Sequence, residues 1–161
     1  MALDCGSDRD AAAAISSYYK DFLISTQDGL TTSCRLAVTE CPRGSLVVCV
    51  MPDGWSFGGW PPCRPELTDD KHLDEITEIL YCSLANSPPF HYELAGDEAC
   101  DVLTEGEVLD GKSWPVSGLV VADTVALKST QPQAGLVPFL PGYRWFPRRS
   151  NSITSSLRPP S

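Results

Sequence analysis

The sequence predicts one α+β domain: a mostly antiparallel β-sheet with two main helices packed on one of its faces. Two segments, 8–25 and 68–86, repeat apolar residues at helical spacing behind capping residues. The segments between and after them contain short β-rich runs separated by Pro and Gly turns. Helices and strands follow one another without the strict alternation of parallel α/β folds, which favours an antiparallel sheet.

The first helix is expected over residues 8–25. Ser7 supplies a hydroxyl N-cap and Asp10 an acid three residues later, which is typical of a helix start. One apolar stripe follows, made of Ala11, Ile15, Tyr18, Phe22 and Leu23. Asp28-Gly29 ends the segment, because glycine adopts the left-handed cap conformation without steric cost.

A β-hairpin is expected next, from Ser33–Thr39 and Ser45–Met51, because a five-residue connection with Pro and Gly joins two β-rich runs. A third strand is expected to begin at Trp55–Phe57, after the Pro52-Asp53-Gly54 turn. The second helix follows Thr68 and ends before Pro88-Pro89, which cannot continue a helix.

A second hairpin is expected from Phe90–Leu94 and Cys100–Thr104, where apolar and polar residues alternate. The segment Leu119–Leu127 fits either a strand or a short helix. Residues 1–149 are therefore interpreted as a single domain, and 150–161, which consist largely of Ser, Pro and Arg, as a flexible tail.

The charge is unevenly distributed along the chain. Residues 1–143 hold 21 acidic and 8 basic side chains, whereas 144–161 hold four Arg and no acid, and the net charge is −9. The segment Arg64–Asp110 alone has 13 carboxylates against two basic residues. Such a surface repels nucleic acid and anionic membranes and attracts basic proteins. We expect a protein partner with a basic surface.

Two groups of residues are candidates for binding that partner. The acidic group lies at the start of the second helix and comprises Asp69, Asp70, Asp74, Glu75 and Glu78. The aromatic group lies in two turn-rich segments and comprises Trp60, Tyr143 and Trp145. Aromatic side chains at turns commonly anchor protein interfaces. The alternative is that the acids are simply solvated and that the rings close the end of a small core.

The seven cysteines do not indicate a metal or disulfide framework. Their number is odd, the N-terminus shows no secretory signal, and no pair has the short spacing of zinc ligands. Cys49 and Cys82 are expected in the core, and His72 and His91 on the surface. We expect reduced thiols, no metal, no cofactor and a cytoplasmic location. A cysteine-dependent hydrolase is kept as an alternative, although no hydrolase or nucleotide-binding motif is present.

The layout resembles that of the type III secretion chaperones over about residues 8–112. The matching elements are the helix Ile15–Ile24, the strands Ser33–Thr39 and Ser45–Met51, the helix Leu73–Leu84, and the strands within 87–105. Two features depart from the family: only Leu84-Ala85-Asn86 remains of its usual segment after the second helix, and 139–149 has no counterpart. The resemblance implies a homodimer that holds an extended segment of a secretion substrate in hydrophobic grooves.

A toxin-neutralising immunity protein fits the charge distribution as well. Tyr18–Leu23, followed by Asp28-Gly29, is similar to the opening of one immunity-protein fold. The function expected from the sequence is therefore a non-enzymatic, acidic protein-binding module of the chaperone kind. An immunity protein and a cysteine-dependent hydrolase are the alternatives.

Overall fold

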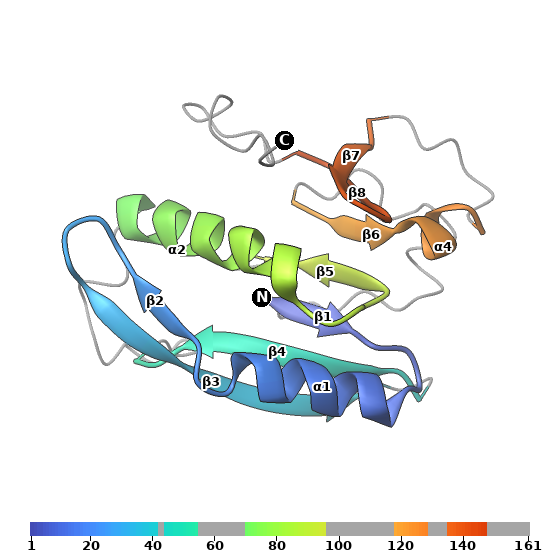
Figure 1. Cartoon of the computed structure of the whole chain (residues 1–161), viewed down its shortest axis with the longest axis horizontal. Helices are drawn as coiled ribbons and strands as arrows, with labels where there is room; N and C mark the ends of the chain where they lie inside the picture. The colour runs from blue at the N-terminus through green and yellow to red at the C-terminus, as the bar shows by residue number, and fades with distance from the viewer. Residues whose placement is uncertain (42–43, 55–69, 96–117, 129–134, 148–161) are drawn as a thin grey trace.

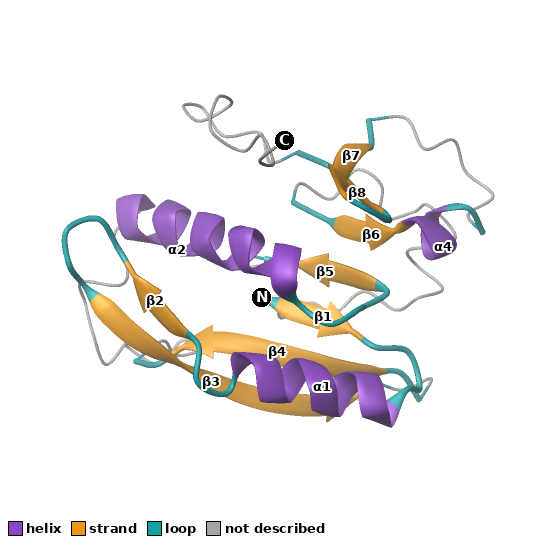
Figure 2. Cartoon of the chain, in the orientation of Figure 1, coloured by secondary structure: helices purple, strands orange, loops and turns teal. Residues whose placement is uncertain are grey.

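A computed structural model describes residues 1–41, 44–54, 70–95, 118–128 and 135–147. These residues form an α+β unit around a single antiparallel sheet of eight strands (Figures 1 and 2). In chain order the elements are β1 (Ala2–Asp4), α1 (Arg9–Tyr19), β2 (Leu23–Ser25), β3 (Thr31–Glu40), β4 (Leu46–Pro52), α2 (Asp70–Ser83), the 3₁₀ helix η2 (Leu84–Asn86), β5 (Tyr92–Leu94), β6 (Val120–Ala122), α4 (Asp123–Ala126), β7 (Val137–Leu140) and β8 (Tyr143–Trp145). The predicted fold class is confirmed.

The N-terminal strand lies in the middle of the sheet. The strand order is β2-β3-β4-β1-β5-β6-β8-β7, and every neighbouring pair is antiparallel. Leu3 of β1 pairs with Val48 of β4 on one side and with Glu93 of β5 on the other. The three-residue β1 therefore joins the N-terminal hairpin to the C-terminal strands.

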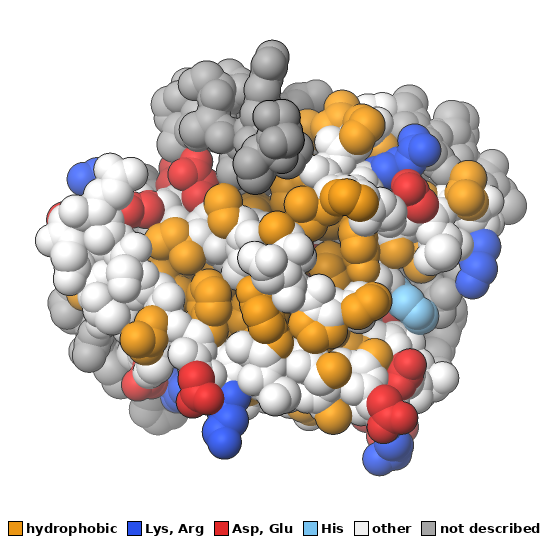
Figure 3. Space-filling model, in the orientation of Figure 1, with side chains coloured by type: hydrophobic (Ala, Val, Ile, Leu, Met, Phe, Trp, Pro, Cys, Tyr) orange, Lys and Arg blue, Asp and Glu red, His pale blue; other side chains and the backbone are white. Residues whose placement is uncertain are grey.

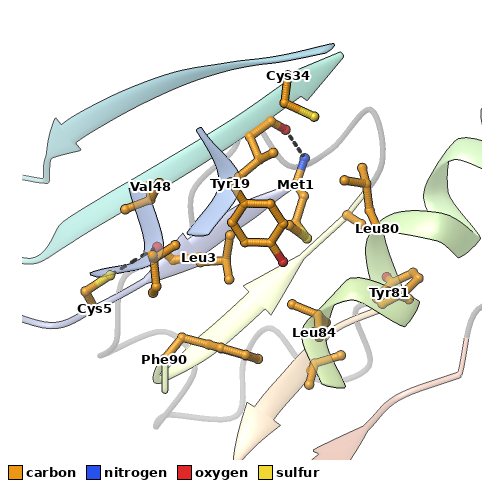
Figure 4. Close-up of a cluster of buried hydrophobic side chains, with 14 of the residues drawn as sticks. Met1, Leu3, Cys5, Tyr19, Cys34, Val48, Leu80, Tyr81, Leu84 and Phe90 are labelled. Carbon is orange, nitrogen blue, oxygen red and sulfur yellow. Dashed lines mark hydrogen bonds between the residues drawn. The ribbon is translucent and has the colours of Figure 1, made fainter. Parts of the chain in front are cut away.

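Helices α1 and α2 lie on the same side of the sheet, which we call the helix face (Figure 1). Figure 4 shows Tyr19 of α1 in the centre of the core beneath them, with Leu80 reaching in from α2 and Leu84 from η2. Leu3 and Val48 complete this core from the sheet. Each large apolar side chain buried here stabilises the fold by about 1.5–3 kcal/mol.

The opposite face carries a smaller core. Tyr92, Leu94 and Val121 project from the central strands and pack against Val125 and Ala126 of α4. The central strands are therefore covered on both faces. Polar side chains on the central strands are therefore buried, whereas a sheet covered on one face only would leave them in water.

The first helix is shorter than the sequence predicts. Its N-cap is Asp8 rather than Ser7, because Asp8 Oδ1 accepts hydrogen bonds from the backbone N–H groups of Asp10 (2.9 Å) and Ala11 (3.0 Å). It ends at Tyr19 instead of continuing to residue 25. Residues 23–25 instead form β2, where Ile24 is fully buried and pairs with Thr32. Burial of Ile24 against β3 outweighs the helical spacing of the preceding residues.

The first predicted hairpin and the second helix are confirmed as β3–β4 and α2. The segment Leu119–Leu127 contains both predicted alternatives, since β6 is followed directly by α4. The next described strand, β5, lies within the predicted strand Phe90–Leu94 and pairs with β1 and β6. The predicted strands at 55–57 and 100–104 and the tail 150–161 lie outside the described residues.

Candidate functional site

Helix α2 presents a partly acidic stripe to solvent. Its core side carries Ile76 and Leu80, and Leu84 of the following η2 continues that side. The outer side carries, at helical spacing, Lys71, Asp74, Glu78 and Cys82. Asp74 is exposed and Glu78 is partly exposed. The structure thus brings these two predicted site residues together on one stripe.

Glu75 is engaged within the chain. Its Oε1 accepts a hydrogen bond of 2.5 Å from the backbone N–H of Gln27, in the loop between β2 and β3. One turn earlier, His72 Nε2 lies 2.7 Å from Asp28 Oδ2 in the same loop. The His72 side chain is only 13% exposed, so its predicted solvated position is corrected. The first half of α2 therefore holds the β2–β3 loop.

The loop carboxylate Asp28 is stabilised in its charged form. Thr26 Oγ1 donates a hydrogen bond of 2.5 Å to Asp28 Oδ1. This bond, followed by those from His72 and the backbone N–H of Leu30, holds the pKa of Asp28 well below its usual value. The carboxylate remains charged through the whole neutral range.

Only part of the predicted acidic surface is found among the described residues, because one carboxylate is buried and several candidates lie outside the described part of the chain. Glu93, one of the 13 carboxylates in the acidic segment, is fully buried beneath the helices and pairs with Leu3 and Val120 in the sheet. Two further candidates, Asp69 and Trp60, lie outside the described residues, as does the side chain of Asp70. Asp74 and Glu78 remain as the described acids facing solvent on α2.

Trp145 belongs to a cluster of rings beside the C-terminal half of α2. Its ring centroid lies 6.0 Å from that of Tyr81 and 5.4 Å from that of Phe139. Tyr81 is buried and donates a hydrogen bond of 2.6 Å to the carbonyl oxygen of Gly118. We call Tyr81, Phe139 and Trp145 the ring cluster; it docks the β7–β8 hairpin against α2.

Tyr143 is held by Phe90. The two rings stack with centroids 4.5 Å apart, and the Tyr143 hydroxyl accepts from the Phe90 N–H (3.1 Å) and donates to the Phe90 carbonyl oxygen (3.2 Å). Burial raises the pKa of Tyr143, so the phenol stays protonated. Tyr143 and Trp145 are both half-buried, and their contact with a partner stays a prediction.

A second apolar surface lies where the end of α1 meets α2. The Tyr18 hydroxyl donates to the Ser83 carbonyl oxygen (3.1 Å), and the rings of Tyr18 and Phe22 lie 6.4 Å apart. Ile79 lies one turn before Ser83 on α2 and, like both rings, is only partly buried. We call Tyr18, Phe22 and Ile79 the seam. Figure 3 shows hydrophobic side chains gathered over the middle of this face, with charged side chains mostly at its rim.

The described cysteines are weak nucleophiles. Burial, followed by the charges of Asp4 and Asp8, raises the pKa of Cys5 to about 11. Burial raises the pKa of Cys34 to about 11 as well, and it also raises the pKa of the other three described thiols, those of Cys41, Cys49 and Cys82. Because the thiolate is the reactive form, none of these five is activated at neutral pH.

The described cysteines are also unpaired and do not converge on a metal. All five are free thiols, and Cys82 is exposed on α2, which corrects its predicted core position. Cys49 is only half-buried, because it projects from β4 on the face opposite the main core. Among the described residues, no group of three or more His, Cys, Asp and Glu side chains is arranged to hold a metal ion.

A buried carboxylate also lies on the face opposite α1 and α2. Asp4 is fully buried and accepts hydrogen bonds from Ser45 Oγ and from the Gly6 N–H (2.9 Å), while its Oδ1 lies 3.5 Å from His91 Nδ1. Burial alone raises the pKa of Asp4, but the hydrogen bonds from His91, Ser45 and Gly6 and the charge of His91 outweigh it and lower this pKa. Because Cys5 beside it stays protonated, this group ties strands together rather than supplying a nucleophile.

Comparisons with protein-family models, curated proteins and solved structures found no match for this chain. Within the described part of the chain, every helix is too short or too polar to span a bilayer.

Proposed function

We propose that this chain is a non-enzymatic protein-binding module, a small cytoplasmic chaperone that holds a partner protein with a basic surface. The observation that carries the proposal is the composition of the helix face. The outer stripe of α2 supplies Asp74 and Glu78, and the partly exposed seam and the partly exposed rings of Phe139 and Trp145 lie beside the same helix.

The apolar side chains and the carboxylates contribute differently to binding. Half-exposed aromatic and aliphatic side chains supply affinity, because a partner removes their remaining apolar area from water. Carboxylates at the rim of such a surface accelerate the encounter with a basic partner. The net charge of −9 adds a field of the same sign over a distance of about 8–10 Å at physiological salt.

The order of elements supports the chaperone proposal. Helix α1, the β3–β4 hairpin and helix α2 follow one another in the order on which the resemblance to the type III secretion chaperones rests, although β2 occupies the end of the first helix that the resemblance implies. The chain differs by adding β1 to the centre of the sheet and the β7–β8 hairpin to one end. The raised pKa values of the five described thiols favour binding over the cysteine-dependent hydrolase.

The test is affinity purification from the native host, followed by mass spectrometry, with two charge-matched variants. Asp74→Lys with Glu78→Lys changes the outer stripe of α2. Asp10→Lys with Asp21→Lys makes the same change in charge at exposed positions on and just after α1. We expect the wild type and the α1 control to retain a specific basic partner that the α2 variant loses.

Equal retention by all three proteins contradicts the proposed surface. The identity of the partner then separates the two binding functions. An exported protein that is kept competent for secretion supports a chaperone, and a toxin whose activity is blocked on binding supports an immunity protein.

A further inference from the structure

One edge of the sheet is open over half of strand β3. β2 pairs with β3 only at Thr31–Ser33, whereas β3 extends to Glu40. The Ser33 carbonyl oxygen accepts a hydrogen bond from Asp53 on the β4 side, so the odd-numbered backbone groups of β3 face β4. The even-numbered groups face outward, because successive residues alternate along a strand.

Among the described strands, none lies beside three outward-facing residues of β3. Leu36, Val38 and Glu40 lie beyond the end of β2, and within the described chain their outward N–H and C=O groups make no hydrogen bond. Val38 is also one of the large hydrophobic side chains left in solvent, with 53% of its surface exposed. An unpaired strand edge of this kind is a template for another strand.

Within the open half of β3, residues 36–39 lack the features that protect edge strands in monomers. Its seven pairs with β4 run without a register shift, and residues 36–39 contain no charge and no Pro. The edge at the other end of the sheet is protected, because β7 carries Pro138 and has a register irregularity between Pro138 and Leu140. Proline and bulges both prevent a further strand from pairing.

We propose that the open edge of β3 pairs with the same edge of a second copy of this chain. In an antiparallel pairing centred on Ala37, Leu36 of each copy lies opposite Val38 of the other. Both side chains stand on the helix face, so each exposed Val38 is covered by a half-buried Leu36. The same register places Arg35 opposite Thr39, so no like charges face each other across the interface.

The proposed dimer and the proposed partner binding differ in their response to salt. Two copies with a net charge of −9 repel each other, so screening by salt should strengthen the dimer. Binding of a basic partner to α2 should weaken with salt. The dimer does not use Asp74 or Glu78, and the two proposals therefore succeed or fail separately.

The first experiment measures the oligomeric state of the full chain by analytical ultracentrifugation over a dilution series. Val38→Pro removes an outward N–H that the monomer does not use, and Val38→Lys places a charge in the interface. Val137→Lys is the matched control, because Val137 is an exposed valine on the opposite, protected edge. Far-UV circular dichroism checks that each variant is folded.

We expect a wild-type dimer whose dissociation constant falls as salt rises. Each Val38 variant should raise that constant at least tenfold, and Val137→Lys should leave it unchanged. A wild type that stays monomeric at every concentration and salt tested overturns the proposal. A dimer that both Val38 variants leave intact overturns it as well.

A second experiment tests the register directly. Ala37 faces its own copy across the two-fold axis at a non-hydrogen-bonded pair, where Cα atoms lie about 4.5 Å apart, within reach of a disulfide. Ala37→Cys, with Cys49→Ala to remove its neighbour on β4, should give a covalent dimer on copper-phenanthroline oxidation. Thr39→Cys in the same background places the two thiols about 13 Å apart and should not. Equal yields from both variants overturn the proposed register.

Discussion

The two hairpins that dock on α2 are held by different interactions. The β2–β3 loop is fixed at the rim by polar contacts, His72 with Asp28 and Glu75 with the Gln27 N–H. The β7–β8 hairpin is fixed by the ring cluster, and the buried Tyr81 hydroxyl of that cluster donates to Gly118, just before the neighbouring strand β6. Apolar burial contributes more free energy than polar contacts that water can replace. The ring cluster should therefore contribute most to the free energy of unfolding, and the polar contacts between α2 and the β2–β3 loop should respond to pH.

The largest expected effect is that of removing the centre of the ring cluster. Tyr81→Ala should lower the free energy of unfolding by about 3–5 kcal/mol, because it leaves a cavity beneath Phe139 and Trp145. Urea unfolding followed by far-UV circular dichroism measures this change. Tyr81→Phe is the control, since it keeps the ring and loses only the hydrogen bond to Gly118, worth about 0.5–1.5 kcal/mol. Equal losses from the two variants would show that ring packing does not hold the hairpin.

A smaller effect is expected at the neighbouring ring. Tyr143→Phe keeps the stacking on Phe90 and removes the hydroxyl that both donates to and accepts from its backbone. The free energy of unfolding should fall by about 1 kcal/mol, measured by the same urea titration. If Tyr143 instead contacts a partner, Tyr143→Phe should weaken partner binding and leave the free energy of unfolding unchanged. That outcome would assign the ring to the interface.

The smallest effect on the free energy of unfolding is expected at Asp28, in the β2–β3 loop, and this effect should be confined to the loop. The lowered pKa of Asp28 means that its contribution to stability is complete above the unfolded Asp value of about 3.9 and is lost as pH falls through the folded value. Asp4 titrates in the same direction, so acid also acts on the centre of the sheet. Asp28→Asn at neutral pH separates the two effects.

Amide hydrogen exchange measures how far Asp28→Asn loosens the β2–β3 loop. The Gly29 N–H bonds to Thr26 within the loop, and its exchange should accelerate in Asp28→Asn while the amide of Phe146, which bonds to Leu119, stays protected. Acceleration at both amides would mean that the two docking sites are coupled and that the two ends of α2 are not held independently.

The sequence predicts elements whose signals are local. Helix α2 and the β3–β4 hairpin carry their own apolar spacing, caps and turn residues, and both are found. Strands β1 and β7–β8 were not predicted, because they are three or four residues long and their pairing partners lie elsewhere in the chain. The alternation of apolar and polar residues at β5 does not reveal that Glu93 is buried, because the alternation gives no sign that α4 and the main helices cover β5 on both faces.

The candidate site is likewise predicted only in part. The spacing of Asp74 and Glu78 places them on one helical stripe, which the structure shows. Glu75, one position away, turns toward the β2–β3 loop, and no local pattern reveals a contact with Gln27. The seam was missed, because the apolar spacing that includes Tyr18 and Phe22 predicts burial and does not show that the helix ends before Phe22.

The most direct test of the proposed binding surface is the rate at which the purified chain associates with its partner as salt is varied. For the wild type, the association rate constant should be high at low salt and fall steeply as salt rises. Asp74→Lys with Glu78→Lys should lower it about tenfold or more at low salt and flatten its salt dependence. The control Asp10→Lys with Asp21→Lys should keep the wild-type slope. An association rate and salt slope that the α2 variant leaves unchanged would contradict the account.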